Sequence, residues 1–304
     1  MLDCLLRQGV EAPHSCRSGV CHTCLMRVVN GTPSIESQKG LKPSLASQNY
    51  FLPCSCSAEQ DLEVVLPDAQ NFRFSTSVVS IDPLTNDIIR LRLERPSNFH
   101  YQPGQYVNLY NPQGVGRSYS LASVPVLDPF LELHMRLVPK GQVSGWVHNT
   151  LKVGAEVTIS DAIGNCFYVA GNPQQNLLLV GTGSGLAPLY GIVRDALHQT
   201  HAGTIKLYHG SSTLAGIYLQ HELHQLSLNH ANFHYFPCVS RESGDDVLQG
   251  RATAIALEQN SKLTDWRVYI CGEPAMVNDT SRAVFLAGAS LQEIYSDPFI
   301  HSKP

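Results

Sequence analysis

The segment SCRSGVCHTC, residues 15–24, places three cysteines within nine positions. Four residues separate Cys16 from Cys21, and two separate Cys21 from Cys24. Thiolate-bound metal centres in proteins commonly use four cysteines, so this segment is one ligand short. The segment LPCSC, residues 52–56, supplies two candidates for the missing ligand, Cys54 and Cys56. The spacing therefore predicts a metal centre that joins residues 15–24 to a distant part of the chain.

A [2Fe–2S] cluster explains this spacing best. The pattern C-x4-C-x2-C with a distant fourth cysteine is that of plant-type clusters, and soft thiolate sulfur suits iron–sulfur centres. Gly19 and its small neighbours leave room for backbone N–H groups to reach the sulfides. A structural zinc site involving His22 is one alternative, but the four-residue gap is unusual for zinc. Four inert buried thiols are the other, and the glycine-containing loop argues against them.

Composition and charge exclude several classes of partner. The charged fraction is 15% and the formal net charge is −4 at pH 7, so no basic surface is expected to bind nucleic acid. The most apolar run, residues 177–180, is far shorter than the about 20 residues that span a membrane, and the N-terminus lacks signal-peptide features. We expect a cytoplasmic chain, in which cysteines serve as ligands, catalytic groups or core residues rather than as disulfides.

Three segments, SCRSGVCHTC, VVNGTP and LPCSC, resemble the plant-type ferredoxin domain of flavin-dependent oxygenase reductases. The resemblance implies a β-grasp ferredoxin domain over residues 1–67. It also implies that Cys56 is not a ligand and that the cluster ligands are Cys16, Cys21, Cys24 and Cys54. Cys4 lies in an apolar helical pattern and is expected in the core.

This domain is expected to be N-terminally truncated relative to the family. Family members carry a β-hairpin ahead of the first helix, whereas this chain starts at the helical pattern of residues 2–8. The remaining strands are expected near residues 25–29, 50–53 and 62–66. A sheet cut in this way exposes an edge and part of its core, so we expect a marginally stable domain.

The middle of the chain, residues 73–170, has the pattern of an antiparallel β-barrel. Short alternating segments such as IIRLRLERP, QYVNLY and LELHMRLV are separated by proline and glycine turns. Many short strands with regular turns are typical of barrels. We therefore expect a second domain of this class after a polar linker.

Two motifs on this barrel suit a flavin. A flavin needs a cation for its pyrophosphate, an aromatic side chain against its ring and a small donor near N5, and the segment RSYS supplies Arg117, Tyr119 and Ser120 in that order. Strand alternation places Arg117 and Tyr119 on one face. The second motif, KGQVSGWVHN, contains Gly141 and Ser144. Taken alone, RSYS favours an ordinary surface Arg–Tyr pair; its place between the cysteine domain and the C-terminal third favours the flavin instead.

These motifs are similar to those of the FAD-binding barrel of the ferredoxin-NADP reductase superfamily. The resemblance implies that Arg117 and Ser144 bind the pyrophosphate, that Tyr119 packs on the ring and that Ser120 lies beside N5. It also implies a segment along the ribityl chain, held mainly through backbone atoms, formed by His134, Met135 and Arg136.

The last third, residues 175–304, predicts a doubly wound parallel α/β domain. NLLLVGTGSGLAPLYGIVRDAL, residues 176–197, is an apolar strand, a glycine loop and an amphipathic helix. Continuous apolar strands suit a parallel sheet covered on both faces, and a helix N-terminus after glycines suits a phosphate. Strands and helices then alternate to the end of the chain.

The loops of this domain resemble the pyridine-nucleotide domain of the same superfamily. The segments GTGSGLAP and CGEPAM carry the resemblance, which implies nucleotide contacts from Thr182, Gly183, Gly185 and Gly272. It places Cys271 near the nicotinamide, facing the flavin; a buried strand-end thiol is the alternative. The aromatic residue near the C-terminus, Phe299, is a candidate for a position beside the flavin.

Two further segments bear on cofactor choice. HELH, residues 221–224, lacks the spacing of a catalytic zinc motif and is expected on a solvated helix face. Arg241 could bind the 2′-phosphate of NADPH, but Glu242, Asp245 and Asp246 would repel it. The sequence therefore favours NADH.

Together the three parts predict an NAD(P)H-dependent flavin/iron–sulfur reductase. NAD(P)H gives up two electrons as a hydride, whereas a [2Fe–2S] cluster accepts one electron at a time, and FAD can exchange electrons in both ways. Ser120 and Cys271 are the predicted catalytic residues beside the path of the hydride. The expected acceptor is an oxygenase component or a ferredoxin-like protein. Alternatives are a reductase for a deoxysugar dehydrase, a flavin diaphorase without its cluster, and a zinc-stabilised binding module without flavin.

Overall fold

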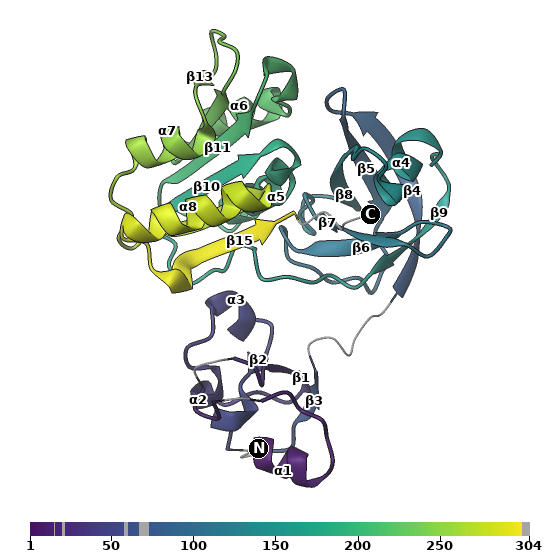
Figure 1. Ribbon diagram of the computed structural model, residues 1–304, viewed down its shortest axis with the longest axis vertical. Helices are drawn as coiled ribbons and strands as arrows, with labels where there is room; N and C mark the ends of the chain where they lie inside the picture. Colours follow the sequence, from purple (N-terminus) through teal and green to yellow (C-terminus); the bar gives the residue numbers. More distant parts are fainter. Residues whose placement is uncertain (15, 20–21, 58–59, 67–72, 300–304) are drawn as a thin grey trace. The chain divides into compact units, whose positions relative to one another are not determined.

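A computed structural model describes residues 1–14, 16–19, 22–57, 60–66 and 73–299. The chain divides into two compact units, Met1–Phe72 and Arg73–Pro304, which are coloured purple to blue and blue to yellow in Figure 1. No helix in the described ranges combines the length and the apolar character needed to cross a membrane. The division of the second unit near residues 170–175 stays a prediction.

The first unit is a small antiparallel sheet with short helices. Its described elements are α1 (Leu2–Arg7), β1 (Met26–Asn30), α2 (Ile35–Gln38), α3 (Pro43–Ala46), β2 (Tyr50–Phe51), η1 (Pro53–Ser55) and β3 (Glu63–Val65). The strand order is β2-β1-β3, with the strands near the predicted positions. Two separate clusters of buried side chains form its core, one around Leu52 and one around Phe51.

The prediction for Cys4 is wrong. Its thiol is exposed, and the guanidinium of Arg7 donates a hydrogen bond to it over 3.2 Å. The helix α1 has six residues and buries Leu2 rather than Cys4. A helix this short presents only one narrow side to the core, so the apolar pattern around Cys4 did not identify which side that was.

The first part of the second unit is the predicted barrel. Its strands are β4 (Arg73–Pro83), β5 (Ile88–Glu94), β6 (Tyr106–Tyr110), β7 (Gly116–Ser120), β8 (Phe130–Arg136) and β9 (Glu156–Ser160), with helix α4 (Gln142–Asn149) before β9. The antiparallel order is β7-β6-β9-β4-β5-β8. A bridge between Leu121 and Leu133 joins the two ends of this sheet, so that the sheet closes around a core that includes Leu91, Val107 and Leu131.

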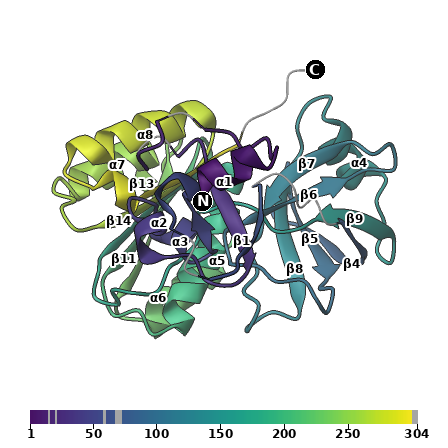
Figure 2. The same cartoon turned by 90° about the horizontal axis from the view of Figure 1, so that it is seen from below.

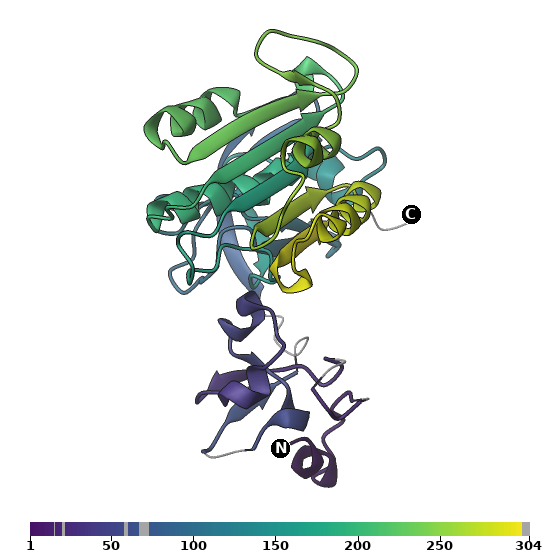
Figure 3. The ribbon, with the colours of Figure 1, turned by 90° about the vertical axis from the view of Figure 1, so that its left-hand side faces the viewer.

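The rest of the unit, here called the nucleotide lobe, has a six-stranded parallel sheet of order β13-β12-β11-β10-β14-β15. Its strands are β10 (Leu177–Thr182), β11 (Ile205–Ser211), β12 (Phe233–Val239), β13 (Leu248–Gln249), β14 (Arg267–Gly272) and β15 (Ile294–Pro298). Its helices are α5 (Leu186–His198), α6 (Gln220–Asn229), α7 (Ala252–Gln259) and α8 (Pro274–Leu286), with short turns η2 (Gly183–Gly185), η3 (Leu214–Gly216) and η4 (Leu291–Glu293). Figure 3 shows its strands side by side, from green to yellow.

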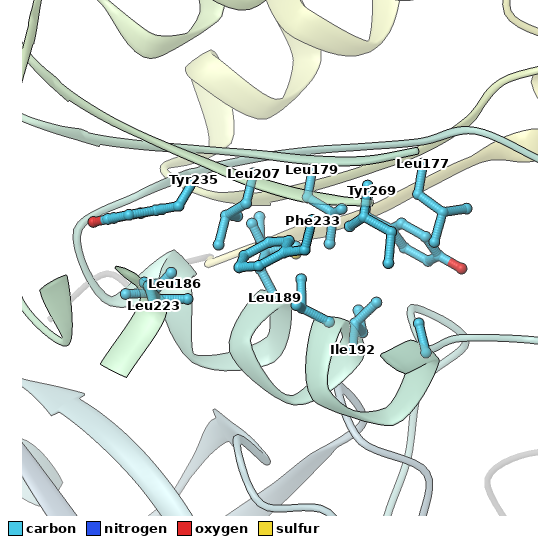
Figure 4. Close-up of a cluster of buried hydrophobic side chains, with 14 of the residues drawn as sticks. Leu177, Leu179, Leu186, Leu189, Ile192, Leu207, Leu223, Phe233, Tyr235 and Tyr269 are labelled. Carbon is cyan, nitrogen blue, oxygen red and sulfur yellow. The ribbon is translucent and has the colours of Figure 1, made fainter. Parts of the chain in front are cut away.

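Both faces of this sheet are covered. Leu177 and Leu179 pack with the side chains of α5 and α6, as the close-up in Figure 4 shows for Leu189 and Ile192. Leu178 and Val180 pack with those of α7 and α8 on the opposite face, where the two helices lie together in Figures 1 and 2. Successive apolar side chains of β10 therefore pack in two cores, one on each face of the sheet. This arrangement confirms the predicted doubly wound fold.

Candidate functional site

The structure brings two of the predicted cluster ligands together in the first unit. Cys24 is buried with Leu52, and Cys54 on η1 packs against the same cluster of side chains. Burial raises the pKa of the Cys24 thiol to about 11, and interaction with Cys54 also affects it. Cys16 is exposed, and its sulfur accepts a hydrogen bond from the N–H of Ser18 over 3.4 Å.

The remaining two cysteines of the motif are Cys21 and Cys56. Cys21 lies outside the described residues. Cys56 is buried with Met26 and Phe51 in the other core cluster, although only one residue separates it from Cys54. The short turn η1 therefore sends the two thiols into different environments, and only Cys54 joins Cys24.

A glycine lets the cysteine loop close on η1. Gly19 has φ +78°, and a Cβ at this position would lie 2.7 Å from Oγ of Ser55, the neighbour of Cys54. A side chain at this position would meet the Ser55 hydroxyl beside the predicted fourth ligand, Cys54. The described residues hold no group of three metal-ligating side chains; the pairing of Cys24 with Cys54 and the close approach of the loop fit part of a [2Fe–2S] cluster held by sulfur ligands.

On the barrel, the RSYS motif forms most of strand β7. Arg117 and Tyr119 are half-buried on one face, while Ser118 on the other face is exposed and hydrogen-bonds to Asn108. Burial raises the pKa of the Tyr119 hydroxyl, so this side chain stays neutral and can cover an apolar ring. Ser120 is 5% exposed at the end of the strand.

The second barrel motif forms a tight turn at the start of α4. The N–H of Val138 donates to Oγ of Ser144 over 3.2 Å, and a Cβ on Gly141 would collide with that same oxygen. Gly141 and Ser144 are thus brought together as the resemblance implies. The backbone leaves no room for a side chain at Gly141, and such a turn can accommodate a phosphate.

Along β8, the structure adds what the sequence left open, namely where the side chains point. Met135 is fully buried in the barrel core. His134 points the other way and lies 3.2 Å, from Nδ1, to the hydroxyl oxygen of Tyr218 in the nucleotide lobe. The guanidinium of Arg136 pairs with Asp87 over 2.9 Å and lies 3.0 Å from where a Cβ of Gly183 would be.

The glycine loop of the nucleotide lobe packs tightly on the end of β14. A Cβ on Gly185 would collide with the carbonyl oxygen of Cys271, and one on Gly272, which has φ +137°, would lie 2.7 Å from Oγ1 of Thr182. Gly183 also has a positive φ, +55°. The predicted residues Thr182, Gly183, Gly185 and Gly272 therefore lie at one edge of the sheet, where the absence of large side chains suits the binding of a dinucleotide.

The sequence analysis missed Asp297, which connects the two lobes. Oγ of Ser120 on the barrel donates to Oδ2 of Asp297 over 2.8 Å, and Asp297 on β15 is the strand partner of Cys271. Burial raises the pKa of the Asp297 carboxyl, and the Ser120 hydrogen bond opposes this shift. The one sequence signal for Asp297 is an acidic residue in the apolar segment IYSDPF, residues 294–299. The N–H of Phe299 donates to the carbonyl of Gly272 over 2.8 Å, so Phe299 lies at the same edge.

Cys271 has a second thiol beside it. Its sulfur lies 3.8 Å from that of Cys166, and both side chains are buried. Burial, and then the contact with Cys166, raises the pKa of the Cys271 thiol far above its ordinary value. The thiol is therefore neutral, which suits a packing surface rather than a nucleophile.

Among the residues that the structure describes, HELH does not belong to any group of three metal-ligating side chains. His224 on α6 places its ring edge-on against Tyr235, with ring centroids 5.4 Å apart, and His221 is exposed. This arrangement agrees with the expected helix face.

Comparisons with known proteins match all three parts of the chain. Residues 1–59 match the 2Fe-2S iron-sulfur cluster binding domain, residues 75–168 the oxidoreductase FAD-binding domain and residues 179–282 the oxidoreductase NAD-binding domain. The chain is 33% identical to the ferredoxin–NAD(P)+ reductase component of the naphthalene 1,2-dioxygenase/salicylate 5-hydroxylase systems of a Ralstonia species, over 99% of this chain and 94% of that protein. It is 30% identical to the corresponding component of the naphthalene 1,2-dioxygenase system of Pseudomonas putida, over 98% and 93%.

Solved structures of reductases are similar to this chain over nearly its whole length. A cytochrome P450 reductase of Amycolatopsis superposes with a TM-score of 0.72 at 28% identity, covering 97% of this chain and 92% of that one. The ferredoxin reductase in carbazole 1,9a-dioxygenase superposes with a TM-score of 0.68 at 27% identity, covering 98% and 92%.

Proposed function

The chain belongs to the family of oxygenase reductase components that join a 2Fe-2S domain, an FAD-binding domain and an NAD-binding domain, and we propose that it passes electrons from NADH to an oxygenase component. When bound, FAD and a [2Fe–2S] cluster supply the conversion of a hydride into single electrons. The observation that carries the proposal is the meeting of Ser120, Asp297 and Cys271 at one edge between the barrel and the nucleotide lobe.

The barrel residues are proposed to hold FAD. Arg117 and the turn of Gly141 and Ser144 are placed to bind its pyrophosphate, and the neutral Tyr119 to cover its ring. The backbone of β8 at His134 and Met135 is proposed to follow the ribityl chain, with Phe299 on the nucleotide-lobe side. Half-buried Arg117 and Tyr119 on one strand face, with the tight turn at Ser144, support these roles.

Ser120 and Asp297 are proposed to handle the proton at the flavin. A buried carboxyl with a raised pKa keeps its proton at a pH where a solvated aspartate has lost it. Oγ of Ser120 bonds directly to that carboxyl, so the hydroxyl is oriented rather than free to rotate. When Asp297 is ionised, its Oδ2 accepts from the Ser120 hydroxyl; when Oδ2 is protonated, it donates to Oγ of Ser120 and the serine O–H can turn toward the flavin. The pair can therefore hold a proton at Oδ2 of Asp297 and pass it on through the Ser120 hydroxyl.

The nucleotide lobe is proposed to bind NADH through Thr182, Gly183, Gly185 and Gly272, with the neutral Cys271 thiol against the nicotinamide. The preference for NADH rests on charge. Arg241 is exposed and surrounded in sequence by exposed acidic residues, and Glu242 accepts a hydrogen bond from the N–H of Leu214 over 2.6 Å. A second phosphate would therefore meet negative charge beside the one cation.

Reductive titration tests the proposed function. The protein, purified without oxygen, should contain iron, sulfide and FAD, and NADH should deliver about three electrons per chain, two to FAD and one to the cluster. Uptake of about two would leave a flavin diaphorase. A colourless protein that contains zinc and no flavin would overturn the proposal in favour of a binding module.

A further inference from the structure

A buried polar chain runs from the barrel to the glycine loop, and the roles proposed above leave it unexplained. Glu132 and His134 lie on one face of β8, each 4% exposed. Arg92 donates from Nε to Oε2 of Glu132 over 2.9 Å, and Oε1 of Glu132 lies 3.0 Å from Nε2 of His134. These hydrogen bonds hold Glu132 ionised and lower its pKa to about 2 despite its burial.

Tyr218 continues this chain into the nucleotide lobe. It precedes α6 and is 3% exposed. Its hydroxyl oxygen lies 3.2 Å from Nδ1 of His134, and the hydroxyl donates to the carbonyl oxygen of Gly183 over 3.4 Å. The His134 ring lies between the Glu132 carboxylate, on its Nε2 side, and the Tyr218 hydroxyl oxygen, on its Nδ1 side, so these contacts fix the position of that hydroxyl.

Gly183 is the residue on which these contacts converge. It begins η2 with a left-handed backbone, φ +55°, and its carbonyl direction sets how the following N–H groups of the loop are turned. The guanidinium of Arg136, on the same face of β8 as His134, lies against it as well. One face of a barrel strand thus contacts the first turn of the nucleotide-binding loop.

We propose that Glu132, His134 and Tyr218 are positioning residues that hold the Gly183 turn of the nucleotide-binding loop in register with the flavin-binding barrel. This inference rests on the proposed function, because it assigns the chain to the alignment of NADH with FAD. A displacement of about 1 Å at a reacting centre can lower a rate by about a hundredfold. A fixed contact between the two lobes at the loop itself limits such displacement.

The test uses Tyr218→Phe, with Tyr168→Phe as a matched control. Tyr168 is a buried tyrosine of the same core cluster, 4% exposed, whose hydroxyl lies 3.0 Å from Nδ1 of His201. Both substitutions remove a buried hydroxyl that contacts a histidine, but only the Tyr218 hydroxyl contacts His134 and Gly183. Glu132→Gln serves as a second variant, because it keeps the shape of the side chain and removes its charge.

Two readouts are measured on the full chain. Without nucleotide, hydrogen–deuterium exchange of the amides of residues 183–187 should be about tenfold faster in Tyr218→Phe, because the Gly183 carbonyl has lost its donor. In anaerobic stopped flow, the rate of FAD reduction at saturating NADH should fall about tenfold, with FAD content and melting temperature close to those of the control. Glu132→Gln should shift both readouts in the same direction.

The outcomes separate the two proposals. Exchange and reduction that change in Tyr218→Phe but not in Tyr168→Phe support the positioning role. Equal behaviour of the two variants, or an unchanged loop in Tyr218→Phe, overturns it. If NADH fails to reduce the wild-type protein, the proposed function itself is wrong, and the exchange data alone then decide whether Tyr218 holds the loop.

Discussion

The two units of the chain differ in how much core surrounds their cofactor sites. Among the described residues, the first unit has two buried clusters of five and four side chains, and the expected ligand Cys24 is a member of one of them. The second unit has three clusters of 21, 15 and 13; Cys271 and Met135 are members of these clusters, whereas Arg117, Tyr119 and Asp297 are not among their buried side chains. A small core that includes its own metal ligands depends on the metal, whereas a large core supports a site at its edge.

The largest effect is therefore expected from the cluster ligands. Cys54→Ser should abolish cluster binding, unfold the first unit and eliminate electron delivery to a protein acceptor, while NADH still reduces FAD. Iron and sulfide content, limited proteolysis and dye reduction measure these properties. The control is Cys56→Ser, two positions away in the opposite cluster, which should keep its iron. Loss of iron in both variants would refute the assignment of Cys54 as the ligand.

One Leu→Ala substitution in the core of each unit compares how the two cores tolerate a cavity. Leu52 and Leu109 are both fully buried, and Leu→Ala at each site should remove about 2–5 kcal/mol of stability. In the first unit this should be enough to release the cluster, whereas the barrel should remain folded at room temperature. Both tryptophans, Trp146 and Trp266, are in the second unit, so tryptophan fluorescence reports its unfolding and cluster absorbance reports that of the first. Simultaneous loss of both signals in Leu52→Ala would contradict the comparison.

The stability of the second unit should change with pH because Glu132 titrates. Its pKa is lowered from 4.5 to about 2 in the fold, so its stabilisation is present above pH 4.5 and is lost as the pH falls toward 2. The difference corresponds to roughly 3 kcal/mol. Urea unfolding followed by tryptophan fluorescence should show a smaller loss of stability between pH 5 and pH 3 in Glu132→Gln than in the wild type. Parallel curves for the two proteins would show that Glu132 does not titrate in this range.

The smallest change in stability is expected at the edge between the lobes. Asp297→Asn should leave FAD content and unfolding nearly unchanged, because the amide keeps the size of the carboxyl and its oxygen can still accept the Ser120 hydrogen bond. The rate of flavin reduction should fall by about tenfold. The part of its pH dependence that comes from the titration of Asp297 should disappear. Measuring kcat between pH 4.5 and 8 tests this. A variant that unfolds or loses FAD would show that the site is part of the core after all.

The sequence predicted those parts of the site that depend on local spacing. Cysteines at fixed intervals and glycines after an apolar strand have direct geometric consequences, so Cys24, Gly183 and Gly185 could be found without a structure. The fold class followed for the same reason, since alternation and apolar runs decide which residues are buried.

The residues that were missed come from distant segments that only packing brings together. Asp297 meets Ser120 across 177 positions, and Cys166 meets Cys271 across 105. Alternation along β8 placed His134 opposite Met135, yet it carries no information on which element faces His134. Cys4 shows the same limit, because one turn of helix does not define a buried side.

The exposure of Cys16 has a consequence for how the protein is matured. Cys24 and Cys54 face the interior of their unit, while Cys16 is exposed, so the expected cluster has one side toward solvent. Iron and sulfide would then reach the cluster from the solvent side, and dissolved oxidants would meet it on the same side. We expect cluster insertion and oxidative damage to share the surface around Cys16.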